Sequence, residues 1–202
     1  MIKFKKISAK FIFVRIIFQG DKSMKSRAEC IQEYGSEYFV EKKIEEGELF
    51  KVGRGVYSET NSVPDMALYS YKYPNAVVTM KTAFSYYGLT DVISDECELA
   101  TKRDAAKIKD KKVKQYFVAD EFFKEGIEIA EYMGYDVRIY NRERMLIELV
   151  RYKSKLPYEY YKEIIRNYRK LVPELDMQKI QDYALLSPKS GKVLGIIETE
   201  VL

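Results

Sequence analysis

The sequence predicts an α+β fold of two domains, the larger of which has a small sheet covered by helices and a helical end. Hydrophobic residues make up 47% of the 202 residues and aromatic residues 14%, which is enough for a substantial core. Apolar residues alternate in some segments and recur at helical spacing in others, so both strands and helices are expected. A polar stretch with a proline at residues 60–64 predicts a linker between a domain at 24–60 and a domain at 65–202.

Residues 1–23 form a leader that admits three interpretations. The leader carries six basic residues and one acidic residue, and its apolar run at 11–18 is shorter than the roughly 20 residues that a membrane span needs. It could be a first helix capped by Ser8, a peripheral membrane anchor, or an over-extended reading frame. We favour the last, because the codons for Gln19-Gly20-Asp21 can contain a ribosome-binding sequence just upstream of Met24.

Two short helices joined by a tight turn are predicted after Met24. Ser26 can cap the first helix and Gly35 can end it, and Ser36 can cap the second helix at residues 37–46. Apolar residues recur in both segments at the spacing of one helical face. This arrangement is typical of a helix-turn-helix.

A hairpin with a basic tip is predicted next. Residues 48–52 are strand-like, Gly53-Arg54-Gly55 is a tight turn in which the glycines permit a positive φ, and Val56-Tyr57 begins the return strand. A helix pair followed by such a hairpin is a winged helix-turn-helix. In this module the second helix enters the major groove of DNA, and the wing touches the backbone or the minor groove.

The candidate DNA contacts lie on the second helix and the hairpin. Their lysines would fix the register on phosphates, while Arg54 could do the same or enter a groove. The segment 24–59 holds six basic and eight acidic residues, so any affinity must come from a one-sided arrangement of charge or from help elsewhere. The alternative is a solvated helix face beside a structural hairpin. The candidate residues are Ser36, Tyr38, Lys42, Lys43, Lys51 and Arg54.

The larger domain begins with two predicted helices, one at 65–71 and one that Thr79 can cap and Gly88 can end. Strands are predicted at 96–101, 112–118, 126–129 and 135–140, the last with clean alternation. Helices are predicted at 142–152, 158–171 and 177–186, and residues 191–202 are either a helix or a strand.

Two segments of this domain are strongly basic, with net charges of +5 at 102–114 and +6 at 138–170. One interpretation is a second nucleic-acid surface, because tyrosines interleave with basic residues at 151–162 and would suit backbone contact and stacking. The other, which we favour, is a solvated face with tyrosines in the core. The candidates for the second basic surface are Lys102, Arg103, Lys107, Arg142, Arg144 and Arg151, and the interleaved tyrosines are Tyr152, Tyr158, Tyr160 and Tyr161.

Enzymatic chemistry finds little support in the sequence. The chain has no histidine, which excludes Ser-His-Asp and Cys-His catalysis and histidine-ligated zinc. Cys30 and Cys97 lie far apart and read as ordinary buried thiols in a reduced, cytosolic setting. Asp95, Glu96 and Glu98 could bind magnesium but lack a matching partner. We therefore expect no catalytic residue, no metal site and no cofactor.

Three motifs follow one another between residues 24 and 183. They are Gly47-Glu-Leu-Phe-Lys51 with Gly53-Arg-Gly-Val-Tyr57, then Tyr73-Pro-Asn-Ala-Val-Val-Thr79 with Thr82-Ala83 and Tyr87-Gly-Leu-Thr90, then Asn141-Arg-Glu-Arg-Met-Leu-Ile-Glu-Leu149. In these motifs and their order the chain resembles the AbiEi family, the antitoxins of bacterial abortive-infection toxin–antitoxin pairs of type IV. Tyr87 stands where the family commonly has histidine, Met145 replaces an expected threonine and Glu148 an expected aspartate.

The resemblance implies a winged helix that represses its own operon and a larger domain needed to counter a nucleotidyltransferase-like toxin. We therefore expect a cytoplasmic DNA-binding autorepressor that acts as an antitoxin and does not insert into a membrane. Its partners would be duplex DNA of its own promoter and the cognate toxin, contacted directly or opposed functionally. Paired half-sites would suit a homodimer on DNA. The alternative is an antitoxin that works mainly by protein–protein contact, with DNA binding secondary.

Overall fold

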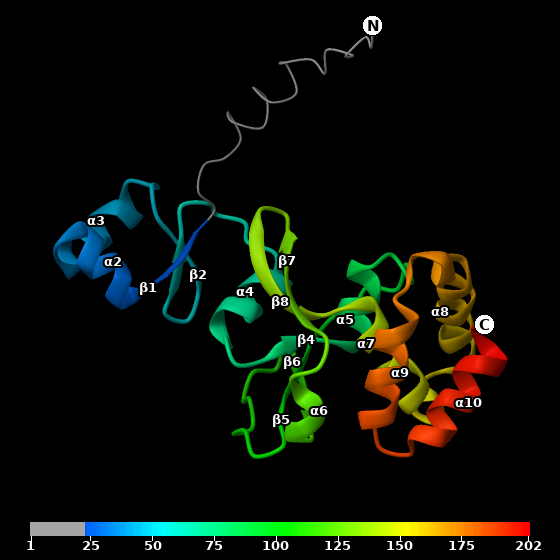
Figure 1. The fold of residues 1–202 in the computed structure, drawn as a ribbon. Coiled ribbons are helices and arrows are strands. Elements are labelled where there is room, and N and C mark those ends of the chain that lie inside the picture. The colour runs from blue at the N-terminus through cyan, green and yellow to red at the C-terminus, as the bar shows by residue number, and fades with distance from the viewer. Residues whose placement is uncertain (1–22) are drawn as a thin grey trace, which may run out of the picture. The chain divides into compact units, whose positions relative to one another are not determined.

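The computed structural model describes residues 23–202, and these divide into two compact units, one that ends at Val63 and one at Pro64–Leu202 (Figure 1). The division falls within the 60–64 stretch taken as a linker from the sequence. The interpretations of the leader lie, except for its last residue, outside the described residues. The mixture of helices, small sheets and a helical C-terminal part confirms the predicted α+β class.

The first unit contains two helices, α2 (Arg27–Tyr34) and α3 (Glu37–Glu45). Ser26 caps α2 in a capping box with Glu29, and Gly35 ends the helix in the left-handed conformation with a φ of 88°. The Ser36 side chain accepts a hydrogen bond from the backbone N–H of Phe39 and so caps α3. Both helices therefore begin where their caps predict, and α2 also ends there, while α3 ends at Glu45, one residue before the predicted end at 46.

A three-stranded antiparallel sheet completes the first unit, in the order β1-β3-β2. The predicted hairpin is β2 (Phe50–Gly53) and β3 (Val56–Ser58), and β1 (Met24–Ser26) is a strand that the sequence pattern did not indicate. Cys30, Val40, Leu49 and Tyr57 form the buried core of this unit, against which Ile31, Tyr34 and Ile44 pack. The core joins both helices to the sheet and thereby fixes the outer face of α3.

The second unit is built on a mixed five-stranded sheet in the order β6-β5-β4-β8-β7. β4 pairs antiparallel with β5 and parallel with β8, while β5 and β6 are parallel and β7 and β8 form an antiparallel hairpin. Val77 and Val78 of β4 point to opposite faces and are both fully buried, so the centre of the sheet is covered on both sides. The strands are β4 (Val77–Val78), β5 (Cys97–Lys102), β6 (Val113–Val118), β7 (Ile127–Tyr132) and β8 (Tyr135–Tyr140).

Helices cover this sheet and form the C-terminal part of the unit. α4 packs on β4, β5 and β8, α5 lies between β5 and α7, and α7 contacts both α9 and α10. The last segment, which the sequence left open between helix and strand, is helical. The helices are α4 (Asp65–Lys72), α5 (Met80–Tyr86), α6 (Asp120–Phe123), α7 (Arg142–Arg151), α8 (Tyr158–Leu171), α9 (Met177–Leu186) and α10 (Ser190–Glu200), with short 3-10 turns η1 (Lys153–Lys155) and η2 (Val172–Glu174).

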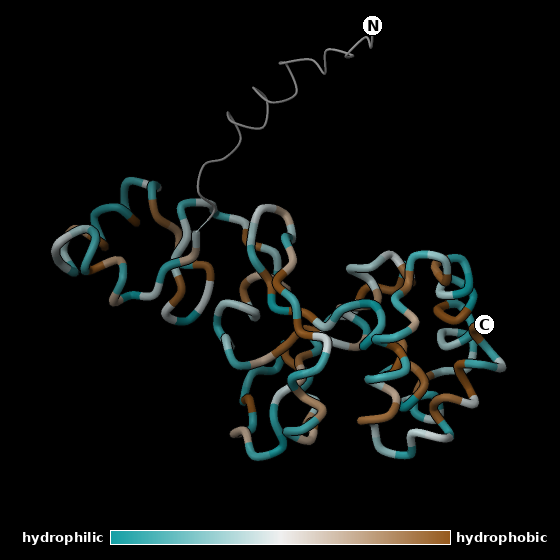
Figure 2. The backbone as a smooth tube through the Cα atoms, in the orientation of Figure 1, coloured by the Kyte–Doolittle hydropathy of each residue, from teal (hydrophilic) through white to brown (hydrophobic). Residues whose placement is uncertain are grey.

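α8 shows how the sequence places these helices. Tyr161, Ile164, Ile165 and Tyr168 recur at the spacing of one helical face and are all buried, so this face packs on the core. Burial of each large apolar side chain contributes about 1.5–3 kcal/mol, and the Tyr168 hydroxyl also donates a hydrogen bond to the carbonyl of Arg142 at 2.9 Å. Apolar stretches run through the centre of the sheet as well (Figure 2). Within residues 23–202, no helix is both long enough and apolar enough to cross a membrane.

Candidate nucleic-acid interface

The outer face of α3 carries two exposed aromatic rings. Val40 is fully buried and Ile44 packs on the same core, so the opposite side of the helix faces solvent. Tyr38 is 71% exposed and Phe39 is 50% exposed, and their rings meet edge to face with centroids 5.4 Å apart. Tyr38 thus lies where the sequence places a DNA contact, and Phe39 extends the apolar surface beside it. Phe39 was missed because its spacing reads as core.

The lysines of α3 are both engaged with carboxylates. Lys42 lies 3.8 Å from Glu46, one turn further on, and keeps about half of its side chain exposed. Lys43 is ion-paired and hydrogen-bonded to Glu48, and this contact raises the pKa of its ammonium group. Because an exposed ion pair is weak, a phosphate can compete for either lysine, with Lys42 the easier to recruit.

Arg27 neutralises acidic residues of α3, a role that sequence reasoning missed. Its guanidinium is ion-paired with Glu37 and lies 3.1 Å from a carboxylate oxygen of Glu41. The same guanidinium donates a hydrogen bond to the Tyr57 hydroxyl at 2.6 Å. Arg27 therefore ties α2 to α3 and to β3, and it offsets two of the negative charges that made this segment acidic.

The wing presents two cations to solvent. Lys51 and Arg54 are exposed, and among the residues that the structure describes neither forms an ion pair. Arg54 sits in the two-residue turn between Gly53 and Val56. Of the two flanking glycines, Gly55 supplies the positive φ of the turn, 73°, and Gly53 is not in that conformation. These two side chains are the least engaged cations of the predicted interface.

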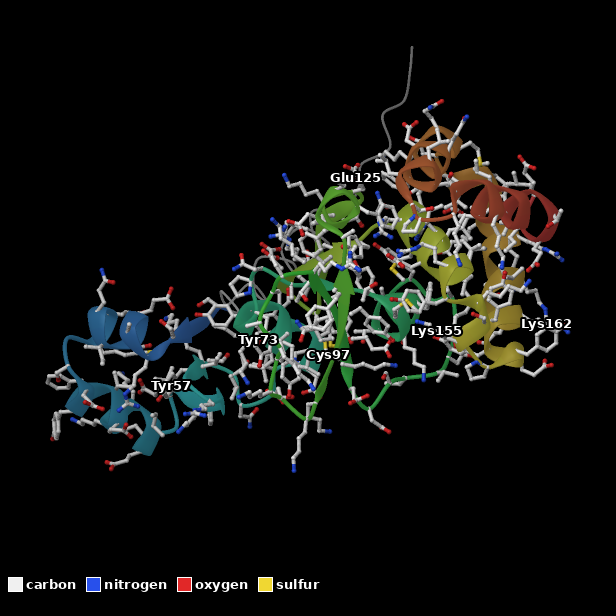
Figure 3. The ribbon with its side chains drawn as sticks, turned by 90° about the horizontal axis from the view of Figure 1, so that it is seen from below. Tyr57, Tyr73, Cys97, Glu125, Lys155 and Lys162 are labelled. Carbon is white, nitrogen blue, oxygen red and sulfur yellow. The ribbon has the colours of Figure 1, made fainter. Side chains whose placement is uncertain are left out.

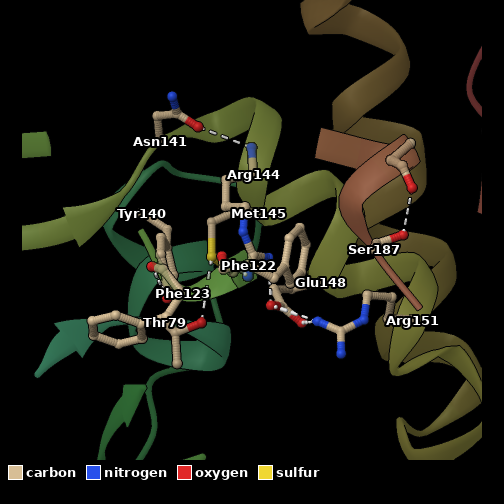
Figure 4. Close-up of polar contacts among 11 residues, drawn as sticks. Thr79, Phe122, Phe123, Tyr140, Asn141, Arg144, Met145, Glu148, Arg151 and Ser187 are labelled. Atoms are coloured by element: carbon tan, nitrogen blue, oxygen red, sulfur yellow. Dashed lines mark hydrogen bonds and ion pairs between the residues drawn. The ribbon is translucent and has the colours of Figure 1, made fainter. Parts of the chain in front are cut away.

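The second basic surface needs correction at Arg144 and Arg151. The Arg144 side chain has no exposed area, is ion-paired with buried Glu148 and lies over the Phe122 ring, 3.4 Å from its centroid (Figure 4). Arg151 is also largely covered and binds both oxygens of Glu148 at 2.9 Å. Arg144 is therefore part of the core and cannot serve as an exposed surface, whereas Arg151 keeps 20% of its side chain exposed while it holds Glu148. The sequence pattern of a helix shows where charges fall but not whether a charged side chain has a buried partner.

The other four candidates of that surface lie in two places. Lys102 ends β5 and lies 3.5 Å from Asp120, and the loop that follows carries exposed Arg103 and Lys107. Arg142 begins α7, pairs with Glu174 at 3.2 Å and lies over the Tyr87 ring, 5.5 Å from its centroid.

Of the acidic residues near β5, Glu98 has a structural role. Glu98 is buried, and its carboxylate accepts hydrogen bonds from the Lys114 ammonium and the Tyr116 hydroxyl, both at 3.1 Å. Its other oxygen accepts the Lys81 backbone N–H at 2.6 Å and so caps α5, which corrects the expectation that the Thr79 side chain does so. Among the described residues no group of three or more acidic or thiol side chains is placed to hold a metal ion. Both cysteines are buried free thiols, as expected.

Among known proteins, a solved structure is similar to this chain in fold. No family model matches the chain, and no curated protein matches it. The structure is similar to the crystal structure of the RV2827C protein from Mycobacterium tuberculosis, with a TM-score of 0.60 and 10% sequence identity over 93% of this chain and 75% of that chain. At this identity the likeness concerns the fold alone.

Proposed function

We propose that the chain is a DNA-binding transcriptional autorepressor that acts in the cytoplasm as the antitoxin of an abortive-infection pair. The first unit would bind duplex DNA of its own promoter. The second unit would be needed to counter a nucleotidyltransferase-like toxin. The antitoxin part of the proposal rests on the resemblance to the AbiEi motifs, and the DNA-binding part rests on the geometry of the first unit.

The observation that carries the proposal is the joint presentation of α3 and the wing. α3 follows α2 through a tight turn at Gly35, and its outer face exposes Tyr38 and Lys42. The hairpin that follows exposes Lys51 and Arg54 without ion-pair partners among residues 23–202. In winged helices such a second helix reads the major groove, while wing cations contact phosphates or a minor groove.

Each candidate would have a distinct role in this complex. Lys42, Lys51 and Arg54 would bind phosphates, and Lys43 would contribute less because Glu48 already holds its ammonium group. The Tyr38 ring would contact base edges, such as a thymine methyl group. Ser36, whose oxygen caps α3, keeps its hydroxyl proton for a phosphate oxygen.

The test is binding of the Met24–Leu202 chain to its own promoter and to random DNA across a salt series. Arg54→Ala and Lys51→Ala should each flatten the log–log salt slope by about 0.9, the value for one lost phosphate contact. Lys43→Ala should flatten it less. Lys124→Ala, which removes an exposed lysine of the second unit, is the matched control and should leave the slope unchanged. Equal affinity for promoter and random DNA would reduce the winged helix to a scaffold.

A second candidate is an antitoxin that acts mainly by direct contact with its toxin. It is favoured by the exposed Tyr38–Phe39 pair on a segment that is acidic overall, since aromatic residues are enriched where proteins bind one another. Co-purification with the product of an adjacent nucleotidyltransferase-like gene, lost in the Tyr38→Ala/Phe39→Ala variant, would favour this mode. Retained promoter binding without co-purification would favour the repressor.

A further inference from the structure

Two hollows meet on the helical side of the second unit. The larger, of about 640 Å³, is lined by the end of α7, by η1, by the start of α8 and by the first turns of α10. The smaller, of about 330 Å³, is lined by α8 and Glu200. Lys153, Tyr158 and Tyr161 line both hollows, so the two are neighbours, and together they are here called the α8–α10 groove.

The lining of this groove is strongly one-sided in charge. No carboxylate lines the larger hollow, and Glu200 is the one acidic residue that lines the smaller. The basic residues of the two linings are Arg151, Lys153, Lys155, Lys162, Arg166, Arg169, Lys189 and Lys192. A concave surface lined by one sign of charge focuses the field and attracts ligands of the opposite sign.

The single carboxylate is already engaged. Glu200 is ion-paired with Lys153, and its other oxygen accepts a hydrogen bond from the Tyr161 hydroxyl at 2.7 Å. Although partial burial works against ionisation, these contacts hold the pKa of Glu200 below its ordinary value. Arg169 also donates to the Glu200 carbonyl at 2.7 Å. Among the described residues, no carboxylate pairs with the remaining exposed cations, Lys155, Lys162, Arg166, Lys189 and Lys192.

One aromatic ring is presented at the junction of the hollows. Tyr158 is 65% exposed, and the Lys162 ammonium lies over its ring, 4.9 Å from the centroid. Tyr160 and Tyr161, by contrast, are buried, so the interleaved tyrosines of this segment divide between core and surface. Lys155 and Lys162 both lie on the side of the second unit that carries α8 (Figure 3). The groove therefore combines an exposed ring with cations on both sides of it.

We infer that the α8–α10 groove binds single-stranded nucleic acid, with its phosphates on the unpaired lysines and one base stacked on Tyr158. Both hollows together are of the size that holds a nucleotide. A basic groove with an exposed aromatic platform is the chemistry of strand-binding proteins. A duplex hides its base faces, and an acidic peptide would leave Tyr158 without a stacking partner. This site goes beyond the proposed function, in which the first unit binds duplex DNA.

The test is fluorescence anisotropy of the full chain with labelled oligo-dT and oligo-rU of about 12 nucleotides, within the range of known strand-binding sites. Lys189→Ala/Lys192→Ala should flatten the salt slope by about 1.4 and weaken binding on the order of tenfold at moderate salt. Lys124→Ala/Lys179→Ala, with the same loss of charge outside the groove, is the matched control and should change neither quantity. A preference for one strand type supports the site and identifies DNA or RNA as the source.

Two further variants test the ring and the carboxylate. Tyr158→Ala should weaken binding by about fivefold or more, whereas Tyr158→Phe should retain it because the stacking face remains. Glu200→Gln should strengthen binding, since it removes the only negative charge of the groove and frees Lys153. Unchanged melting temperatures of the Lys189→Ala/Lys192→Ala and Tyr158→Ala variants would tie these effects to binding.

Three results would overturn the inference. One is an equal salt slope for the groove variant and its control. The second is competition by a random duplex of the same length as strong as that by the single strand. The third is competition by oligo-glutamate as strong as that by the oligonucleotide, which would reassign the groove to an acidic protein segment. Promoter binding, measured with the variants of the first unit, reports on the proposed function separately.

Discussion

Arg144 and Glu148 form an ion pair one turn apart on α7, with 0% and 3% of their side chains exposed. The guanidinium lies over the rings of Phe122 and Tyr140, 3.4 Å and 4.6 Å from their centroids. Arg151 adds a second cation to the same carboxylate. A carboxylate between two guanidinium groups is satisfied in a core that would otherwise disfavour its charge, so this cluster depends on all of its members.

Glu148→Gln should therefore destabilise the protein by about 3–5 kcal/mol, because it leaves the buried Arg144 without a counter-charge. Urea unfolding would measure the loss. Glu174→Gln, which breaks the exposed pair with Arg142, is the matched control and should cost less than about 1 kcal/mol. Similar losses of unfolding free energy in the two variants would mean that the buried pair contributes no more to stability than the exposed one.

Gly126→Ala should also destabilise, by about 2–5 kcal/mol in total. Gly126 has a φ of 73°, and an added Cβ would come within 2.4 Å of the Arg144 Cβ. Gly195→Ala is the opposite case, since Gly195 lies in α10 with open space around it, and it should stabilise by about 0.5–1 kcal/mol. Thermal unfolding of the two variants should thus shift in opposite directions.

Glu37→Gln should strengthen promoter binding on the order of threefold, because it removes a negative charge from α3 and frees the Arg27 guanidinium. Arg27→Ala should weaken binding, since Glu37 and Glu41 would face the phosphates without compensation. Gel-shift titrations would compare them with Glu33→Gln on α2, whose carboxylate pairs with Lys25 and should have little effect. Equal affinities across the set would show that α3 does not approach the phosphates.

Both thiols should resist modification in the folded state. Burial raises the pKa of Cys97 to about 12, with a further contribution from the charge of Asp65, and burial also raises the pKa of Cys30. At pH 8 a disulfide reagent should react slowly with the native chain. In urea, where the chain is unfolded, the reagent should react with both thiols. Rapid reaction of one equivalent without denaturant would contradict this expectation.

The same shift predicts a pH dependence of stability. A thiol whose pKa is higher in the folded state contributes stability that is fully present below its unfolded value of about 8.5 and is lost as the pH rises toward 12. The difference in free energy of unfolding between wild type and Cys97→Ala should therefore shrink as the pH rises from about 8.5 toward 12, the range between these two pKa values. A difference that grows over this range would contradict the assignment.

Elements with local signals could be predicted from the sequence. Ser26, Gly35 and Ser36 set the ends of the first helices through their own backbone and side-chain chemistry, and the alternation of β8 marks its buried face. The strand β4 lacks such a signal, because Val77 and Val78 are too few to show a period. α6, with four residues, is equally short.

In the candidate site, the sequence predicted the placement of side chains that depend on their own turn or helix and not on a distant partner. Lys51 and Arg54 are exposed on the wing as their turn implies, whereas Arg27 reaches α3 across a helix boundary that no spacing rule describes. Arg144 looked like a surface residue because α7 reads as amphipathic. In the structure, other helices and the sheet surround α7 from residues 144 to 150, and a buried partner replaces solvent. Whether a charged residue on such a helix is buried or exposed thus depends on packing with elements far away in the sequence.

The two-residue strand β4 has a consequence for synthesis of the chain. Val78 pairs with β5 on one side and with Ile139 of β8 on the other. The central pairing of the sheet therefore cannot form until Ile139, 61 residues further along the chain, has been synthesised. The first unit is complete once Val63 has left the ribosome, long before that pairing can close. A nascent chain stalled before residue 139 would thus carry a finished winged helix followed by a sheet with an unfilled edge, exposed to chaperones and proteases.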